Sequence, residues 1–402
     1  MMVLPPLALY IHVPWCVRKC PYCDFNSHGV GRGAELPEIR YVEALLADLE
    51  HDLPAVQGRE IVSIFIGGGT PSLFSAAAYQ RLFDGLRQRL TFAADIEITL
   101  EANPGTVEQA RFEGYRQAGI NRLSIGIQSF AAGQLEALGR IHSGEEAVRA
   151  MRSAQDAGFD NVNLDLMHGL PGQTLETALE DIEQALALEP THLSWYQLTL
   201  EPNTEFFSHP PSLPDEERLW DIQDAGHALI ESNGLSRYEI SAYARPGRQA
   251  RHNLNYWRFG DYLGIGAGAH GKLSSIGPQG EWRIERRWKT RQPESYLRRL
   301  NDPRGFVAGG QQVDGNVLPL EFLMNALRLV EGVNAEDWEN HTGRALSELT
   351  PRLETARLKG LLRDTPSRLQ ASPQGLLFLN DLLALFDEES STKRVDPRAT
   401  AG

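Results

Sequence analysis

The stretch that decides the fold begins at residue 10 and reads Tyr10-Ile11-His12-Val13-Pro14-Trp15-Cys16-Val17-Arg18-Lys19-Cys20-Pro21-Tyr22-Cys23. Three residues separate Cys16 from Cys20 and two separate Cys20 from Cys23, and the 402-residue chain has no other cysteine. Cysteines gathered this closely cannot join distant parts of a chain through disulfides, but one loop can wrap them around a metal. The pattern therefore predicts a metal site in a loop that follows a strand.

The number of cysteines indicates which metal the loop holds. A structural zinc site normally takes four protein ligands, and a [4Fe-4S] cluster normally takes four cysteines. Three thiolates leave one iron of such a cluster free to bind the amino and carboxylate groups of S-adenosylmethionine. We therefore favour a [4Fe-4S] cluster on Cys16, Cys20 and Cys23. The alternatives are a chance group of buried thiols and a zinc site completed by His12 or His28.

The overall composition is that of a folded globular protein, with 42% hydrophobic and 23% charged residues. Its length exceeds the roughly 250–300 residues at which single cores stop growing, so we expect one large domain and a smaller one. A formal net charge of -14 argues against a protein that coats nucleic acid. The N-terminus lacks the basic segment of a secretory signal, and no apolar run reaches the roughly 18 residues of a membrane span, so we expect the cytoplasm.

Up to about residue 244, short β-branched runs alternate with longer segments of helical period, which is typical of βα units on a parallel sheet. The predicted strands cover 8–12, 61–66, 95–100, 122–128, 161–167, 193–200 and 238–243. This spacing fits either an open sheet or a full or partial (β/α) barrel.

Polar residues at the strand ends favour the barrel. Gly67 ends one strand and opens a run of three glycines, whose backbone groups have no Cβ to keep a ligand away. Glu101, Gln128 and Asp165 fall at or just past the ends of three further strands, where barrels place their working residues. Carboxylates suit ribose hydroxyls and Arg140 suits an α-carboxylate, although each residue alone also fits a helix cap or a surface ion pair.

The regular alternation stops after residue 244, where a region rich in Gly, Arg and aromatic residues begins. We expect a connecting region over 245–305, a mostly helical, winged-helix-like C-terminal domain over 306–386 and a disordered tail over 387–402. The connecting region holds a basic island made up of Arg283, Arg286, Arg287, Lys289, Arg291, Arg298, Arg299 and Arg304. A solvated face explains this island better than the docking of haem propionates or of an acidic partner.

The cysteine triplet, the glycine run 67–70 and the segments 126–130 and 165–172 resemble radical S-adenosylmethionine (SAM) proteins related to oxygen-independent coproporphyrinogen III oxidase. The resemblance implies a partial (β/α)6 barrel with the three cysteines as cluster ligands. It also places a set of residues around SAM: Tyr10, Gly68, Gly69, Thr70, Glu101, Gln128, Arg140 and Asp165. Tyr22, beside the last cysteine, would pack against the adenosine or the cluster edge.

Two features make the chain more similar to the haem chaperones of this group, the HemW type, than to the oxidases. The oxidases have a further cysteine two residues after the triplet, whereas Asp24 and Phe25 follow it here. The segment His252-Asn253-Leu254-Asn255-Tyr256-Trp257 matches the HNxxYW sequence associated with haem binding in the chaperones. An imidazole can ligate iron while Tyr256 and Trp257 cover the macrocycle, but a packed aromatic cluster around a core histidine fits the same residues.

The sequence thus predicts a chaperone that binds haem near the HNxxYW segment, Asn253 included, and delivers it to a haem-requiring apoprotein. A membrane-associated respiratory protein is one candidate recipient, and a homodimer is compatible with the sequence. The alternatives are a coproporphyrinogen III oxidase and a radical SAM protein with some other substrate. We expect chaperone activity rather than the dehydrogenase reaction, with the [4Fe-4S] cluster, SAM and haem as the bound groups.

Overall fold

The protein is described as a computed structural model that covers residues 4–31, 33, 35–105 and 109–387. Six parallel strands form its centre: β1 (Leu7–Val13), β4 (Ile61–Gly68), β5 (Phe92–Ala102), β6 (Arg122–Gln128), β7 (Val162–His168) and β8 (His192–Gln197). Each strand pairs with the next in this order. The predicted α/β architecture with six βα strands is confirmed, and within the described residues the sheet stays open.

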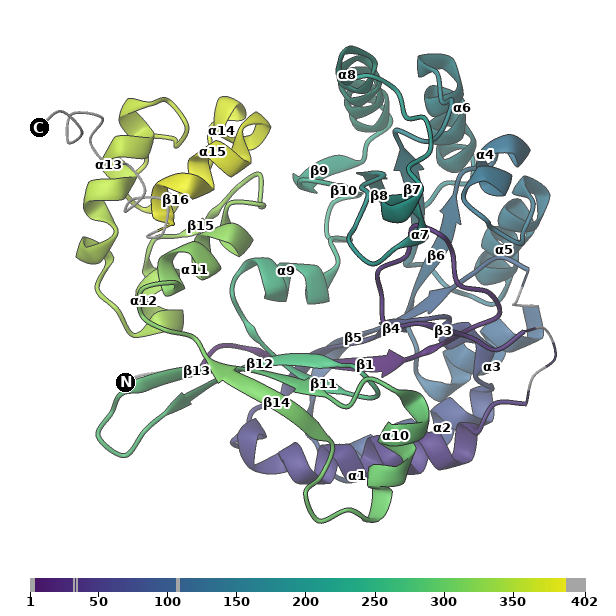
Figure 1. Ribbon diagram of the computed structural model, residues 1–402, viewed down its shortest axis with the longest axis horizontal. Helices are drawn as coiled ribbons and strands as arrows, with labels where there is room; N and C mark the ends of the chain where they lie inside the picture. The colour runs from purple at the N-terminus through teal and green to yellow at the C-terminus, as the bar shows by residue number, and fades with distance from the viewer. Residues whose placement is uncertain (1–3, 32, 34, 106–108, 388–402) are drawn as a thin grey trace, which may run out of the picture.

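Helices cover the outer face of these strands (Figure 1). They are α1 (Glu38–Val56), α2 (Ala76–Arg87), α3 (Gln109–Ala118), α4 (Ala132–Ala137), α5 (Gly144–Asp156), α6 (Leu175–Leu186), α7 (Glu205–Ser208) and α8 (Glu216–Ser232), with a short 3-10 turn at Pro71–Leu73. Side chains fix where these helices begin. The Ser143 hydroxyl accepts a hydrogen bond from the Glu146 amide and the Glu146 carboxylate accepts one from the Ser143 amide, which is the capping box that starts α5.

The region after β8 extends the sheet at both edges. At one edge lie the antiparallel strands β10 (Ala242–Ala244) and β9 (Ser236–Glu239), where the sequence predicted one strand over 238–243. At the other edge, β11 (Asp261–Ile265) pairs in parallel with β1, and β12 (His270–Ile276), β13 (Trp282–Lys289) and β14 (Val307–Gln312) follow antiparallel. Much of the predicted connecting region 245–305 is therefore part of the same twelve-stranded sheet.

The remaining elements of this region are helical. They are α9 (Arg251–Trp257), α10 (Pro293–Arg298) and a 3-10 turn at Arg299–Asn301. Figure 1 shows α9 between the sheet and the C-terminal helices, so the HNxxYW segment lies at the seam between the two parts of the molecule.

The C-terminal part is mostly helical, as predicted. It comprises α11 (Leu318–Ala326), β15 (Val333–Asn334), α12 (Glu336–Thr342), α13 (Thr350–Leu358), β16 (Arg368–Leu369), α14 (Pro373–Leu377) and α15 (Leu379–Leu383), with 3-10 turns at Leu346–Glu348 and Ala384–Phe386. Helix α14 ends at Leu377 and α15 begins at Leu379, with Phe378 as the turn between them. The predicted disordered tail lies outside the described residues from 388 onward.

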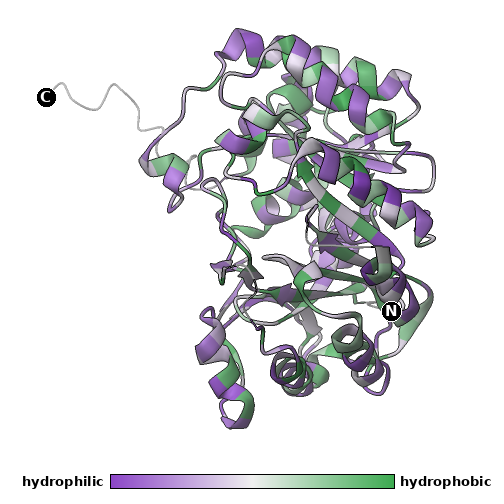
Figure 2. Ribbon diagram, turned by 90° about the vertical axis from the view of Figure 1, so that its right-hand side faces the viewer, coloured by the Kyte–Doolittle hydropathy of each residue, from purple (hydrophilic) through white to green (hydrophobic). Residues whose placement is uncertain are grey.

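Two apolar cores hold these parts together. The larger core fills the space between the central strands and their helices, and the second joins the C-terminal helices to residues of β9, β10 and β13. The helix ribbons alternate between hydrophilic and hydrophobic residues in Figure 2, as expected for helices that bury one side. Among the described residues, no helix has the length and apolar character that crossing a bilayer requires.

Candidate functional site

The three cysteines lie in the loop that follows β1. This loop is anchored by two short strands, β2 (Trp15–Cys16) and β3 (His28–Gly29), which pair in parallel. Within the loop the Cys23 amide donates to the Cys20 carbonyl oxygen over 3.2 Å, and the Cys23 sulfur lies 3.6 Å from the Ser27 hydroxyl. The three thiols line a pocket of about 300 Å3 at the C-terminal ends of the central strands.

The pocket gathers almost all of the residues that the sequence associated with SAM. Beside Cys16, Cys20 and Cys23, its lining includes Tyr22, Gly68, Gly69, Thr70, Glu101, Gln128, Arg140 and Asp165. These residues come from the cluster loop, from β4 to β7 and from the loop after α4, because parallel strands bring their carboxyl ends to one edge of a sheet.

Two glycines let the backbone after β4 approach the cluster loop closely. A Cβ on Gly69 would lie 2.5 Å from the Trp15 carbonyl oxygen. Gly68 has φ +114° and would meet the His12 ring at 2.5 Å, so neither position accepts a side chain without displacement. The Gly68 amide donates to the Glu101 carboxylate over 3.1 Å, which ties the glycine run to the end of β5.

Two carboxyl groups, Glu101 and Asp165, line the pocket. Burial, with the nearby Asp165 charge, raises the pKa of Glu101 to about 8. Burial also raises the pKa of Asp165, although the Ser124 hydroxyl and the Asn163 amide donate to its carboxylate over 2.9 and 2.8 Å. Two carboxyl groups that share a site are chemically suited to accept hydrogen bonds from a polyhydroxyl ligand between them.

Arg140 links the two sides of the pocket. One of its terminal nitrogens donates to the Asn103 side-chain oxygen and to the Gly126 carbonyl, over 2.7 and 2.6 Å. The other donates to the Cys20 sulfur over 3.7 Å. The Nε of Arg140 is buried without a hydrogen-bond partner, which is the feature expected where an anionic group binds.

Gln128 is held in a strained conformation at the end of β6, with φ 70°. Its side-chain oxygen accepts a hydrogen bond of 2.8 Å from the Tyr196 hydroxyl, at the end of β8. Positive φ in a residue other than glycine is costly and concentrates at functional sites. The backbone therefore supports a binding role for this strand end.

Sequence reasoning missed five polar residues of the pocket: Arg18, Ser27, Asn103, Ser124 and Tyr196. Asn103 also donates to the Thr70 hydroxyl over 3.0 Å, so it connects two of the predicted residues. The strand-end argument that selected Glu101 applies equally to Asn103 and Tyr196, and it was the signal available to find them.

Tyr10 does not line this pocket. Its ring stacks on Phe65 with a centroid distance of 6.2 Å, and its hydroxyl donates to His12 Nδ1 over 2.8 Å. His12 Nε2 in turn donates to the Asn26 carbonyl over 2.9 Å, and burial lowers the pKa of His12 to about 4. Tyr10 instead lines a second cavity, which the HNxxYW segment helps to form.

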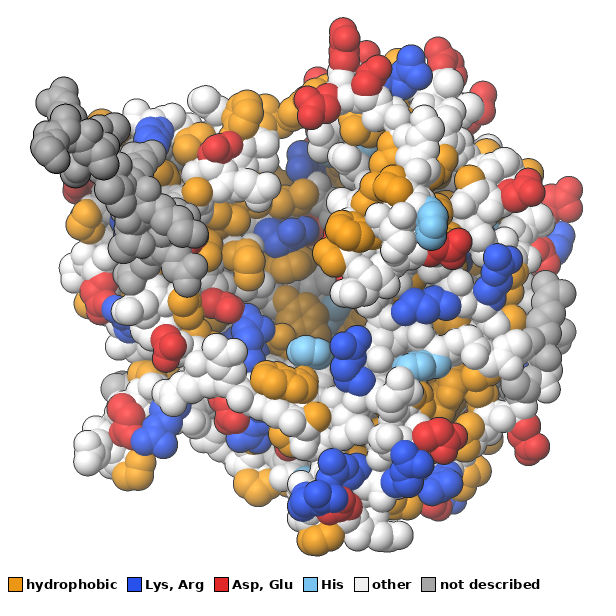
Figure 3. Space-filling model, viewed as in Figure 1, with side chains coloured by type: hydrophobic (Ala, Val, Ile, Leu, Met, Phe, Trp, Pro, Cys, Tyr) orange, Lys and Arg blue, Asp and Glu red, His pale blue; other side chains and the backbone are white. Residues whose placement is uncertain are grey.

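We call this second cavity, of about 290 Å3, the aromatic cleft. It is lined by Tyr10, Tyr256, Trp257, Phe259, Gly260, Tyr262, His270, Lys272, Arg286 and Asn325. In Figure 3 the molecule is hollowed between its two parts, with hydrophobic side chains deep in the hollow. The cleft therefore joins α9, the edge of the sheet and the C-terminal domain.

His252 does not line the aromatic cleft but lies behind its wall, with its ring edge-on to that of Tyr256 at a centroid distance of 6.3 Å. Its ring packs on Phe65 with a centroid distance of 4.1 Å, and its Nδ1 donates to the Glu97 carboxylate over 3.4 Å. The side chain is only 6% exposed, and burial lowers the pKa of His252. Asn253 donates to the Tyr238 hydroxyl over 3.4 Å. These two motif residues thus fix α9 against the sheet.

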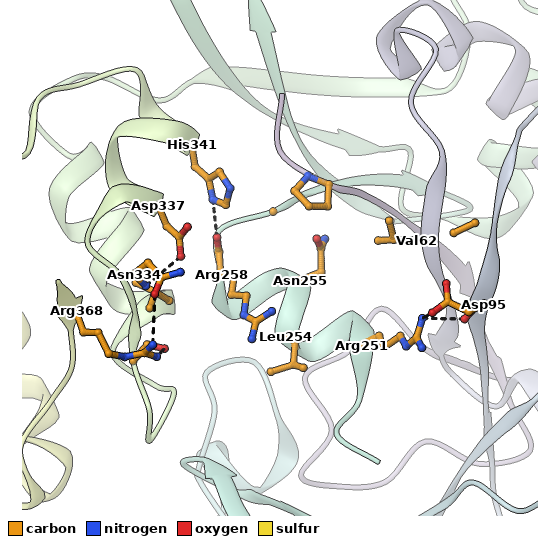
Figure 4. Close-up of a pocket in the computed structure, with 15 residues that line it drawn as sticks. Val62, Asp95, Arg251, Leu254, Asn255, Arg258, Asn334, Asp337, His341 and Arg368 are labelled. Atoms are coloured by element: carbon orange, nitrogen blue, oxygen red, sulfur yellow. Dashed lines mark hydrogen bonds and ion pairs between the residues drawn. The ribbon is translucent and has the colours of Figure 1, made fainter. Parts of the chain in front are cut away.

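The opposite face of α9 borders a third cavity, of about 560 Å3, which we call the arginine cavity (Figure 4). Arg251, Arg258 and Arg368 lie around it. Arg251 forms an ion pair with Asp95 at 2.7 Å. Among the described residues that line the arginine cavity, the one histidine is His341. Its Nδ1 donates to the Arg258 carbonyl oxygen over 2.8 Å.

Comparison with known proteins agrees with this arrangement. Residues 10–185 match the Radical SAM superfamily and residues 313–378 match the HemN C-terminal domain. The chain is 53% identical to the protein named heme chaperone HemW from Escherichia coli, over 96% of this chain and 99% of that one. The chain belongs to the HemW family of radical SAM proteins.

Other members of the HemW family and one solved structure extend the comparison. The Bacillus subtilis heme chaperone HemW is 32% identical, over 94% of this chain and 98% of that one. A mouse mitochondrial protein named radical S-adenosyl methionine domain-containing protein 1 is 34% identical, over 94% of this chain and 86% of that one. The structure of Escherichia coli coproporphyrinogen III oxidase (HemN) superposes with a TM-score of 0.79 and 22% identity, covering 96% of this chain and 91% of that one, and shares the fold.

Membership of the radical SAM superfamily implies a [4Fe-4S] cluster and SAM, and the residues present in this HemW protein fit both. Among the described residues, no three His, Cys, Asp or Glu side chains converge on a single ion. A cubane differs from a single ion because each thiolate binds a separate iron. Burial raises the pKa of Cys16 to about 11, so thiolate formation is coupled to metal binding. The unpartnered Arg140 Nε beside the thiols suits the SAM carboxylate.

Proposed function

We propose that this chain is a haem chaperone, which binds haem at the seam beside α9 and transfers it to haem-requiring apoproteins. The full-length relatives named heme chaperones support this function. The observation that carries it is the position of the HNxxYW segment, which contributes Tyr256 and Trp257 to an aromatic cleft at the edge of the radical SAM barrel. Large aromatic faces in a cleft are suited to cover a flat macrocycle.

We further propose that the pocket at the strand ends holds the cluster and SAM. The thiolates of Cys16, Cys20 and Cys23 would ligate three irons, and the cluster supplies an open iron and an electron for SAM when bound. Arg140 would pair with the SAM carboxylate, and Glu101 and Asp165 would accept hydrogen bonds from its hydroxyls.

The remaining pocket residues would position SAM from the sides. The backbone after β4 would contact the amino group at Gly68, Gly69 and Thr70. Gln128 and Tyr22 would lie against the adenosine portion. Tyr10 lies outside this pocket, so its contact with SAM would come from the side of the aromatic cleft.

The alternative activity is oxidation of coproporphyrinogen III. The HemN superposition shows a shared fold, and 22% identity shows no more than that. Asp24 and Phe25 follow the last cysteine, where the oxidases have a further cysteine. This difference favours the chaperone.

A haem titration of the anaerobically reconstituted protein tests the proposal. We expect stoichiometric haem binding with a shifted Soret band, four irons per chain bound before haem is added, and no change in coproporphyrinogen III supplied with SAM and a reductant. Formation of protoporphyrinogen, or the absence of haem binding, would overturn the assignment.

The recipient and the oligomeric state are finer parts of the same proposal. We propose that the recipient is a haem-requiring apoprotein, with membrane-associated respiratory proteins as the first candidates. We also propose that the chain forms a homodimer. To check the first part, the haem-loaded protein is mixed with such an apoprotein, and haem transfer is measured through the Soret band of the recipient. Light scattering of the loaded and unloaded protein checks the second.

A further inference from the structure

The aromatic cleft contains a histidine outside the HNxxYW segment. His270 is the first residue of β12, and it is the one histidine among the described residues that line the cleft. The exposed His270 side chain stacks against Trp288 of β13 with a ring centroid distance of 6.4 Å. The cleft thus combines an accessible imidazole with Tyr256 and Trp257, which are the elements of a haem pocket.

His252 has the opposite character. Phe65 covers its ring and Glu97 engages its Nδ1. The same Glu97 carboxylate also accepts a hydrogen bond of 2.8 Å from the Arg251 amide at the start of α9. Moving His252 into the cleft would leave the Glu97 carboxylate buried without its imidazole partner, which carries a substantial free-energy cost. The contacts of His252 are those of a residue that positions α9.

Strand pairing holds the backbone around His270. β12 lies between β11 and β13, and seven residue pairs from His270–Trp288 to Ile276–Trp282 join it to β13. A Cβ on Gly264 of β11 would lie 2.0 Å from the His270 carbonyl oxygen, so the glycine permits this close approach. A ligand on a paired strand is held in a fixed position, as a metal-binding imidazole requires.

The charges near His270 suit the binding of haem iron. Burial, then Arg291 and Arg286, lowers the pKa of His270, so the ring is neutral at pH 7 and in the form that binds iron. Arg286 lines the cleft, where it pairs with Glu321 and donates to the Tyr262 hydroxyl over 3.3 Å. A haem propionate would therefore have to replace Glu321 on Arg286, and Arg291 lies outside the residues that line the cleft.

The arginine cavity offers the competing histidine, His341. That cavity has no aromatic residue among its described lining, and its charged groups include Asp95 and Asp337 as well as the arginines. Figure 4 shows Asp337 and Arg258 on the side of the cavity where His341 lies. A large apolar macrocycle is better matched to the aromatic cleft.

We infer that His270 would bind the haem iron and that the macrocycle would lie in the aromatic cleft against Tyr256 and Trp257. This inference rests on the proposed haem-chaperone function and names the ligand that the function requires. The segment that carries the HNxxYW motif then forms a wall of the haem site, while the iron is bound from the strand that faces it.

The test is spectroscopic, with the full chain loaded with haem. Electron paramagnetic resonance and magnetic circular dichroism of the ferric complex report imidazole ligation. We expect His270→Ala to lose this signature and to bind haem at least tenfold more weakly, and free imidazole to restore the signature. Retention of the imidazole signature by His270→Ala would overturn the inference.

Two further variants, each lacking a different histidine, serve as controls for His270→Ala. His341→Ala, in the arginine cavity, should keep both affinity and spectrum. His252→Ala should keep the imidazole signature even where it weakens haem binding through a displaced α9, with circular dichroism checking that it folds. Loss of ligation in either of these variants, with His270→Ala unaffected, would assign the iron elsewhere. If the wild-type protein binds no haem, the proposed function itself fails.

Discussion

Arg140 donates a hydrogen bond to the sulfur of Cys20 over 3.7 Å and thereby joins the loop after α4 to the cluster loop. The same guanidinium bonds to Asn103 and to the Gly126 carbonyl, and its Nε faces no partner. The side chain is thus preorganised by the protein and still has one donor to offer. A proposed cluster ligand and the group proposed to bind the SAM carboxylate are therefore in direct contact.

We predict that Arg140→Met weakens SAM binding by roughly tenfold to a hundredfold, because a charge-assisted hydrogen bond to a carboxylate is lost. Calorimetric titration of the reconstituted protein with SAM measures this. Arg140→Lys keeps the charge but lacks the planar guanidinium group, so its affinity for SAM should lie between those of Arg140→Met and the wild type. Equal affinity in all three proteins would exclude the assigned role, and iron analysis shows whether each carries its cluster.

We predict that Gly69→Ala destabilises the protein by about 1–3 kcal/mol and lowers cluster content, because the new Cβ collides with the Trp15 backbone beside the first cysteine. Denaturant unfolding measures the stability and iron analysis measures the cluster. The matched control is Gly133→Ala in α4, where nothing lies within 4 Å of the new Cβ. The control should be as stable as the wild type or slightly more so; equal stability of the two alanine variants would contradict the steric argument.

The sequence was sufficient to predict the six central strands and the meeting of the three cysteines with most of the strand-end residues in one pocket. Both rest on local signals: β-branched runs give strands, and the parallel arrangement then brings Glu101, Gln128 and Asp165 to one edge. Strands β11 to β14 were missed because their signal is not local. The segment Trp282–Lys289 reads as a basic surface, yet Lys289 is buried and Arg286 is paired, so its charges are satisfied by distant acidic residues.

The orientation of α9 was also beyond the sequence. Helical spacing places His252 and Tyr256 on neighbouring positions of one face, but it does not reveal what that face meets. The side chain of His252 contacts Phe65 and Glu97, and both residues precede it by more than 150 positions in the sequence. The motif therefore led to the proposed haem region, whereas the proposed ligand had to be inferred from the cleft.

The pH dependence of stability should change in Glu101→Gln. The pKa of this carboxyl is raised from 4.5 to about 8, so the folded protein holds a proton that the unfolded chain releases above pH 4.5. Its contribution is therefore fully present below pH 4.5 and is lost as the pH rises to about 8. We expect the wild type without cofactors to lose thermal stability across this window, and the variant to lose less. Thermal melting curves of both proteins, recorded from pH 5 to 9, measure this difference. If the melting temperatures of the two proteins change equally with pH, the raised pKa of Glu101 is contradicted.

Removing the buried ammonium of Lys289 should be among the most destabilising changes outside the cofactor pocket. Lys289 is 2% exposed and bridges Asp48 and Asp52 of α1, so it ties β13 to the helix beneath the sheet. Lys289→Met keeps the volume but leaves Asp48 buried without its cation and Asp52 with only Arg287 at 3.9 Å; loss of one partner of a buried ion pair costs about 3–5 kcal/mol in comparable cases. Denaturant unfolding measures the loss. Arg304→Ala removes a basic residue of the same island whose side chain is 76% exposed, and it should leave the unfolding midpoint unchanged. If the two variants unfold at the same denaturant concentration, the basic island is a solvated face throughout, and Lys289 does not hold the sheet to α1.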